Sequence, residues 1–166
     1  MTIAIRALDP AEWEMLRDFR LQALKSMPGV FMGRFEDSVD RPEAEWRDFI
    51  RGPFNQAFGL FDGDTLIGIT AVFQWREDPS GESALLAASF ILERYRGRHL
   101  SRLLYDARLN WIARQPVFKR VVVGHRQSNE VSRRANQRYG FTEFRRAARV
   151  WPDGTREDEI LYERKP

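Results

Sequence analysis

The stretch from Ile91 to Ile112, ILERYRGRHLSRLLYDARLNWI, constrains the fold more than any other part of the chain. It follows an apolar run, ALLAASFIL (84–92), and leads into a segment whose apolar residues recur at helical spacing. This pattern predicts a strand, a tight turn around Gly97 and a helix. The first backbone N–H groups of such a helix have no intrahelical partner and lie at its positive end. The junction therefore predicts a binding site for an anion such as phosphate.

Arginines flank this turn on both sides, at positions 94, 96, 98 and 102. Their positive charge strengthens the case for an anionic ligand. Arginine-rich helix starts are also common on solvated surfaces, so the charge alone leaves both interpretations open.

The residues of the turn resemble a known motif. Arg94-Tyr-Arg-Gly97-Arg-His99 is similar to the R/Q-x-x-G-x-G/A motif of the GCN5-related N-acetyltransferase (GNAT) family, in which this loop holds the pyrophosphate of acetyl-CoA. The first five positions fit, whereas His99 stands where the family has glycine or alanine. The resemblance implies a cofactor site that runs from the end of the strand into the helix, over Phe90, Ile91, Leu92, Arg94, Arg96, Gly97, Arg98, His99, Leu100, Ser101 and Arg102.

A second block, SNEVSRRANQRYGF (128–141), is similar to the N-x-x-A-x-x-x-Y-x-x-x-G-F segment of the same family. In the family, this asparagine follows a strand and opens a short helix beside the cofactor. Asn129 and the final Gly-Phe pair match, Ser132 takes the place of the small residue, and Asn136 takes the place of a frequent tyrosine. The resemblance implies that Asn129, Ser132 and Asn136 contact acetyl-CoA.

The rest of the chain has the element order of this family. Strands are predicted over residues 2–7, 57–61, 65–74, 84–92, 120–123, 142–151 and 155–163, and helices over 9–27, 40–50, 100–112 and 130–139. The order β-α-α-β-β-β-α-β-α-β-β implies an α/β (α+β) fold with a mixed, mostly antiparallel central sheet of about seven strands and helices on both faces. The length predicts one domain over residues 1–166.

Composition excludes several classes of site. The chain has no cysteine, which excludes disulfides, thiolate metal sites and a cysteine nucleophile. Two histidines, His99 and His125, are too few for a metal centre, so we expect no metal. The net charge of +3 is modest, and the arginines gather between Arg94 and Arg149, beside the two motifs. This distribution favours an anionic cofactor over nucleic acid as the partner.

The first ten residues, MTIAIRALDP, contain no long apolar segment and no cleavage-site pattern. We therefore expect a cytoplasmic protein without a membrane span. A homodimer is compatible with the sequence.

The family resemblance implies acetyl transfer from acetyl-CoA to an amine, with the strand end at residues 90–92 paired to the pantetheine arm. This reaction requires a neutral amine, a stabilised oxyanion and a proton for the departing thiolate. His125, at the end of a buried strand, and Glu36, in a loop, are the candidate bases, and water is a third option. Asn136 stands where the family's tyrosine protonates the thiolate, but an amide donates only a hydrogen bond.

The sequence thus predicts an acetyl-CoA-dependent N-acetyltransferase that acts on a primary amine of a small molecule or of a protein or peptide. Glu36, Asp37 and Asp40, in the loop expected to cover the acceptor, favour a cationic acceptor. A non-catalytic acyl-CoA-binding module is the alternative, because Asn136 and His99 depart from the family pattern.

An acidic run, 157–159, lies in the closing hairpin, which is predicted to turn at Asp153-Gly154. Cross-strand pairing with Arg145, Arg146 and Arg149 explains these acids better than a metal or catalytic cluster does.

Overall fold

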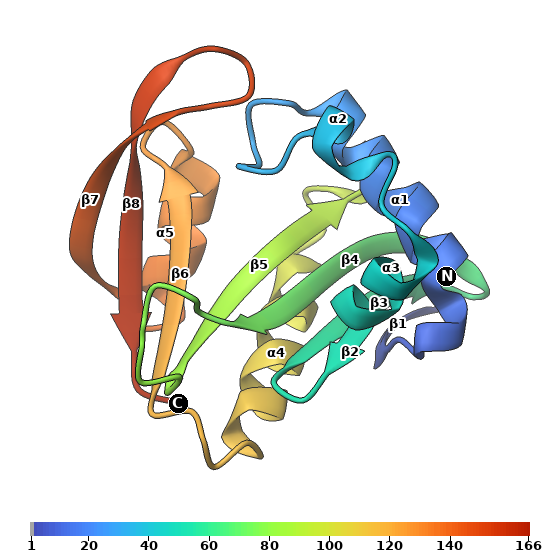
Figure 1. The fold of residues 1–166 in the computed structure, drawn as a ribbon, viewed down its shortest axis with the longest axis horizontal. Helices are drawn as coiled ribbons and strands as arrows, with labels where there is room; N and C mark the ends of the chain where they lie inside the picture. Colours follow the sequence, from blue (N-terminus) through green and yellow to red (C-terminus); the bar gives the residue numbers. More distant parts are fainter. Residues whose placement is uncertain (1) are drawn as a thin grey trace.

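One twisted sheet forms the centre of the computed structural model, which describes residues 2–166 (Figure 1). Its strands are β1 (Ile3–Ala7), β2 (Arg51–Gly52), β3 (Asn55–Asp62), β4 (Thr65–Gln74), β5 (Ser83–Ile91), β6 (Arg120–Arg126), β7 (Thr142–Val150) and β8 (Arg156–Arg164). The helices are α1 (Trp13–Ser26), α2 (Phe35–Ser38), α3 (Glu43–Ile50), α4 (Ser101–Ala113) and α5 (Glu130–Arg138). Two short 3₁₀ turns, η1 (Pro10–Glu12) and η2 (Glu93–Tyr95), precede α1 and α4.

The strands follow the order β1-β3-β4-β5-β6-β8-β7, with β2 paired to β3. Every neighbouring pair is antiparallel except β5 and β6, which are parallel. The predicted fold class and element order are confirmed. The structure adds the two-residue β2 and the one-turn α2, which are too short to produce a periodic pattern.

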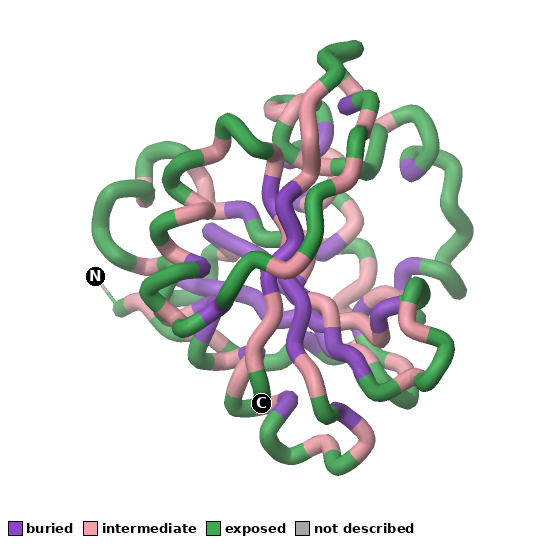
Figure 2. Tube along the Cα trace, turned by 90° about the vertical axis from the view of Figure 1, so that its left-hand side faces the viewer, coloured by how far each residue is buried: buried purple, intermediate pink, exposed green. Residues whose placement is uncertain are grey.

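Helices cover both faces of the sheet, as predicted (Figure 1). On one face, α1 and α3 pack Leu16, Phe19 and Ile50 against β3, β4 and β5. On the other face, α4 packs Tyr105 and Ile112 against β4, β5, β6 and β8. The strands between these layers form the buried centre of the molecule, while loops and helix surfaces are exposed (Figure 2).

The start of the first helical segment is encoded by local hydrogen bonds. The Asp9 side chain accepts a hydrogen bond from the backbone N–H of Ala11, and the Glu12 side chain accepts one from the backbone N–H of Asp9. Pro10 occupies the first position, where a missing N–H costs nothing. This cap sets the start of η1, which leads directly into α1.

The charges of the closing hairpin pair differently from the prediction. Arg149 does contact Glu159, at 3.3 Å, on the opposite strand. Arg145, however, pairs with Glu77 in the loop after β4, and Glu157 pairs with Arg126 on β6 at 2.5 Å. The acids are thus charge partners, but one of them ties the hairpin to a neighbouring strand.

Candidate active site

The two parallel strands β5 and β6 separate toward their carboxyl ends (Figure 1). Their paired register ends at Leu86 and Val123. Beyond that point β5 pairs only with β4, and β6 pairs only with β8. The edge of β5 that faces β6 therefore carries backbone groups without a strand partner, which an extended ligand can pair with.

A β-bulge lies on β5 at this fork. The pairing of β5 with β4 shifts between Ile69 and Ala71, and Ala88 has a φ of 58°. The left-handed region costs a non-glycine residue of the order of 1 kcal/mol, so the surrounding structure must hold this conformation. The bulge directs the segment Ala87–Ser89 into the space between the strands, where it lines a cavity.

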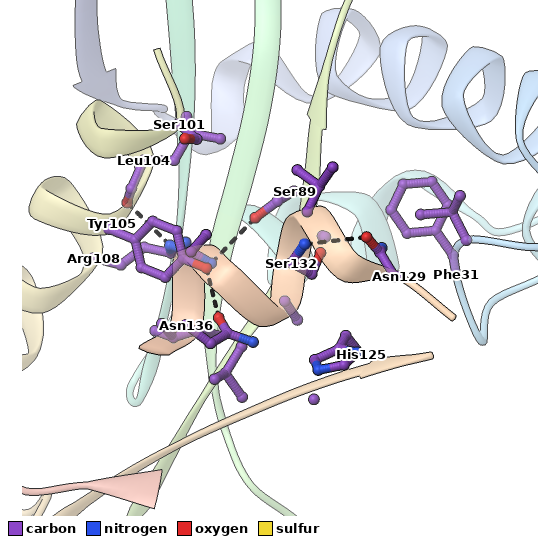
Figure 3. A pocket seen from close by; sticks show the side chains of 18 residues that line it. Phe31, Ser89, Ser101, Leu104, Tyr105, Arg108, His125, Asn129, Ser132 and Asn136 are labelled. Atoms are coloured by element: carbon purple, nitrogen blue, oxygen red, sulfur yellow. Dashed lines mark hydrogen bonds between the residues drawn. The ribbon is translucent and has the colours of Figure 1, made fainter. Parts of the chain in front are cut away.

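The cavity has a volume of about 220 Å³ (Figure 3). It is bounded by β5 and β6, by the inner faces of α4 and α5, and by Val30 and Phe31 of the loop after α1. The site thus takes residues from both sides of the sheet, and it opens where the two parallel strands diverge.

The turn before α4 offers backbone donors beside this cavity. Gly97 and His99 have φ values of 75° and 57°. Leu100 returns to the right-handed region, and a left-handed residue next to a right-handed one is the backbone pattern of anion-binding nests. The N–H groups of His99, Leu100 and Ser101 donate no hydrogen bond within residues 2–166. A Cβ on Gly97 would meet no atom within 4 Å, so the space in front of the turn is open.

The arginines around this turn differ in their contacts. Arg96 folds back, and its Nε donates to the carbonyl of Ile91 at 2.8 Å. Arg94 and Arg98 both lie against the Tyr95 ring, and Arg98 also donates to the carbonyl of Arg94. The motif therefore holds its own turn together in part, while its backbone N–H groups remain available.

Helix α5 presents its predicted residues to the cavity from the other side. Asn129 is the N-cap, and its Oδ1 accepts a hydrogen bond from the backbone N–H of Ser132 at 3.1 Å. Both residues line the cavity, as does Asn136 one turn further on. Asn129 thus fixes the start of α5 and, through it, the position of Asn136.

Asn136 is buried, with 1% of its surface exposed, and its two polar atoms differ. Oδ1 accepts a hydrogen bond from the Tyr105 hydroxyl at 2.5 Å (Figure 3). Nδ2 has no partner within the described chain. An unpaired buried amide donor costs roughly 1 to 3 kcal/mol, which a ligand carbonyl would recover.

Sequence reasoning missed Tyr105, which comes from α4 and lines the cavity. Its ring stacks on Tyr139, the residue that follows α5, at 4.3 Å between centroids, and the Arg108 guanidinium lies 4.8 Å from its ring centre. Burial raises the pKa of Tyr105, and the nearby Arg108 charge opposes that effect. The phenol therefore stays protonated at neutral pH, next to the site that the family tyrosine would occupy.

Arg108 was also missed. It is 3% exposed and lines the cavity, with Nε donating to the Leu104 carbonyl at 3.0 Å and Nη1 donating to the Ser89 hydroxyl at 3.1 Å. Its position in the apolar stripe of α4, four residues from both Leu104 and Ile112, is the sequence signal that could have found it.

His125 lines the cavity from β6, as its position at a strand end predicted. Nδ1 lies 2.6 Å from the Arg126 carbonyl, and Nε2 lies 3.0 Å from the Tyr162 hydroxyl. A carbonyl only accepts, so Nδ1 carries the proton and Nε2 accepts from Tyr162. Burial is the main cause that lowers the pKa of His125. Both ring nitrogens are thus occupied by the protein.

Glu36 and the strand end lie away from the cavity lining. Glu36 is in α2 with its side chain 74% exposed, 3.9 Å from Arg34. Phe90 packs edge-on against Phe19 in the core, and Ile91 and Leu92 are partly buried. If the strand end contacts a ligand, it does so through its backbone.

Within residues 2–166, no group of three or more His, Asp or Glu side chains is arranged to hold a metal ion. No helix in the same range is long and apolar enough to cross a membrane.

The fork, the bulge and the turn correspond to a known family. A sequence model of the acetyltransferase (GNAT) family matches residues 13–141, well over half of the chain. The matched range contains β5, α4, β6 and α5, which build the cavity. The chain therefore belongs to the GNAT family of acetyltransferases, and the predicted family is confirmed.

Solved structures share the fold over nearly the whole chain. A GNAT acetyltransferase from Streptococcus pneumoniae has a TM-score of 0.82 at 16% identity, covering 99% of this chain and 100% of that one. YncA, a putative acetyltransferase from Salmonella typhimurium solved with acetyl-CoA, has a TM-score of 0.77 at 19% identity, covering 99% and 94%. NAA60 from Arabidopsis thaliana, solved with a bisubstrate analogue, has a TM-score of 0.74 at 17% identity, covering 99% and 98%. These likenesses establish the fold. No curated protein matches the sequence.

Proposed function

We propose that the chain is an acetyl-CoA-dependent N-acetyltransferase that modifies a primary amine of a small molecule or of a protein or peptide. The fork between β5 and β6 carries this proposal. An unpaired strand edge, the free N–H groups before α4 and the orphaned Nδ2 of Asn136 surround one cleft. Each is a hydrogen-bonding group that the fold leaves unused, and such groups require a partner when a ligand excludes water.

Acetyl-CoA fits these groups by chemical type. The N–H groups of His99, Leu100 and Ser101, with the surrounding arginines, would hold the pyrophosphate. The open edge of β5 from Ala87 onward would pair with the amides of the pantetheine arm, and Asn136 Nδ2 would donate to a carbonyl. The predicted cofactor contacts at Ser132 and Asn129 line the same cleft.

Bound acetyl-CoA supplies a thioester, whose carbonyl carbon accepts the amine and whose sulfur departs as a thiolate. Two protons must then move. The amine loses its proton to water, because both nitrogens of His125 are already hydrogen-bonded and Glu36 is exposed. The departing sulfur receives the other proton.

Tyr105 is the proton donor in this proposal. In the free protein the hydroxyl donates to Asn136 Oδ1 at 2.5 Å, which holds the phenol at the cavity. As the C–S bond breaks, the O–H bond turns from Asn136 Oδ1 to the sulfur, the proton passes to sulfur, and solvent restores the phenol. The Arg108 charge favours the transient phenolate. The family tyrosine that Asn136 replaces would thus be supplied by α4 instead of α5.

The acceptor enters from the side of the loop after α1, where Val30 and Phe31 line the cavity together with the exposed Val131 of α5. A cytoplasmic location and a homodimer stay predictions. The alternative function is a non-catalytic acyl-CoA-binding module.

Incubating the protein with acetyl-CoA and a panel of amines and peptides, and measuring free CoA, tests the proposal. We expect acceptor-dependent release of CoA. Tight acetyl-CoA binding without release for any acceptor would favour the binding module. Absence of acetyl-CoA binding would overturn both functions.

A further inference from the structure

Arg108 is a buried cation without a carboxylate partner. Its two hydrogen bonds go to uncharged acceptors, the Leu104 carbonyl and the Ser89 hydroxyl, and its third contact is the Tyr105 ring. Ser89 is itself held by the Thr70 hydroxyl at 2.7 Å. Among the described residues that line the cavity, none is an aspartate or glutamate. The protein therefore supplies hydrogen bonds to this guanidinium but no negative charge.

This arrangement destabilises the folded protein. Burying a charge costs several kcal/mol unless an opposite charge compensates it. Burial lowers the pKa of Arg108 to about 10, so the side chain stays cationic at neutral pH. A leucine or methionine at this position would continue the apolar stripe of α4 without that cost. The charge thus points to a ligand that carries the missing negative group.

The cofactor's phosphates are badly placed to be that group. Arg108 lies seven residues beyond Ser101 on α4. At a rise of 1.5 Å per residue this is about 10 Å along the helix from the turn that would hold the pyrophosphate. The counter-charge must therefore be a small anion near the closed end of the fork, beside the bulge at Ala88 and Ser89.

We infer that one of the two substrates carries a carboxylate that pairs with Arg108. Guanidinium and carboxylate match in geometry and charge, and Arg108 lines the cavity in which the acyl group and the amine would meet. The carboxylate belongs either to the acyl chain, as in a dicarboxylic acyl-CoA, or to the amine acceptor, as in an amino acid. This inference rests on the proposed function and names the substrate class of the same site.

Equilibrium binding tests the inference without requiring turnover. In the acyl arm, calorimetry compares succinyl-CoA and malonyl-CoA with acetyl-CoA. In the acceptor arm, the protein saturated with CoA is titrated with α-amino acids and with their methyl esters. We expect the carboxylate ligand to bind about tenfold more tightly or better than its uncharged counterpart in one arm, the scale of a charge-assisted hydrogen bond. The selective arm identifies the source of the carboxylate.

Arg108→Met removes the charge at similar length and should abolish that selectivity, while Arg108→Lys, which keeps a charge, should retain part of it. If Arg108→Met fails to fold, the wild-type comparison and Arg108→Lys still decide. Equal affinities for charged and uncharged ligands in both arms of the wild type would overturn the inference. So would an equal loss of both ligands in a folded Arg108→Met. Failure of the proposed function is separate, because it shows as absent binding of acetyl-CoA itself.

Discussion

Two arginines, Arg126 of β6 and Arg108 of α4, have opposite electrostatic surroundings. Arg126, at the end of β6, is enclosed by acids: Nη1 lies 2.8 Å from Asp153 and Nε lies 2.5 Å from Glu157. Its Nη1 also donates to the Gly29 carbonyl in the loop after α1, at 2.9 Å. Arg108, which lines the cavity from α4, has hydrogen bonds but no acidic partner.

This difference suggests a structural role for the charge of Arg126 and a ligand-binding role for the charge of Arg108. Arg126 joins β6 to segments that are distant in sequence, namely the loop after α1, the turn between β7 and β8, and the start of β8. Its hydrogen bonds to the two acids raise the pKa of Arg126 and lower that of Glu157, which means that the charged forms are favoured. Burial, by contrast, lowers the pKa of Arg108. Arg126 therefore has its counter-charges in the free protein, whereas Arg108 lacks one.

Removing the Tyr105 hydroxyl should have the largest effect on turnover. Tyr105→Phe deletes the proposed proton donor, and we expect turnover to fall about 100-fold or more, within the range attributed to general acid catalysis. Steady-state kinetics should show the loss in kcat, and calorimetry should show nearly unchanged acetyl-CoA affinity. Tyr139→Phe is the matched control, because its hydroxyl contacts Asp106 and the Arg102 carbonyl outside the cavity. Equal turnover in Tyr105→Phe and the wild type would remove Tyr105 from the mechanism.

Replacing Arg126 or Arg108 with methionine tests the comparison through thermal stability. Arg126→Met leaves Glu157 and Asp153 without their cation and should lower the Tm by several degrees. Arg108→Met removes an uncompensated charge and should leave the ligand-free Tm unchanged or higher. Thermal unfolding of both variants by circular dichroism measures this contrast. A large loss of Tm in Arg108→Met would show that Arg108 serves the fold instead of a ligand.

Truncating Asn136 should have a smaller effect on the reaction than losing Tyr105. Asn136→Ala releases the Tyr105 hydroxyl and removes the orphaned Nδ2 donor, but the phenol remains. We expect a decrease in kcat of about tenfold or less, since roughly 1 kcal/mol of hydrogen bonding is lost. A thousandfold loss at unchanged acetyl-CoA affinity would assign Asn136 a direct chemical role.

The smallest effect concerns His125. Its pKa is lowered in the folded state, mainly by burial, from the ordinary value of 6.5. The unfolded chain then binds the proton more readily, so this group contributes stability above pH 6.5 that is lost as the pH falls below it. His125→Asn, which keeps a donor near Nδ1, should therefore show a smaller decrease in Tm between pH 7.5 and pH 5.5 than the wild type. Identical decreases would mean that His125 does not contribute to acid sensitivity.

The features of the structure that depend on a local sequence pattern were predicted from the sequence. Apolar periodicity located the four main helices, the turn motif identified the β5–α4 junction, and Asn129 was correctly placed at the start of α5. The family and fold followed from these elements because their order is specific.

What the sequence did not reveal depends on contacts between distant segments. Tyr105 has the spacing of a core residue, and its bond to Asn136 joins positions 31 residues apart. The pairing of Glu157 with Arg126 instead of a hairpin arginine depends on how β6 lies beside β8. The left-handed Ala88 has no signal at all, because alanine gives no sign of a bulge.

Binding of acetyl-CoA to Gly97→Glu tests the central claim, that the fork and its turn form the acetyl-CoA site. The matched control is Gly154→Glu in the turn between β7 and β8, where φ is 84° against 75° at Gly97 and where a Cβ, as at Gly97, would meet no atom within 4 Å. A glutamate at position 97 would enter the open space before the turn and repel the phosphates. Calorimetry should show a loss of affinity of about 100-fold or more for Gly97→Glu and nearly wild-type affinity for Gly154→Glu. Wild-type affinity in a folded Gly97→Glu would contradict the account.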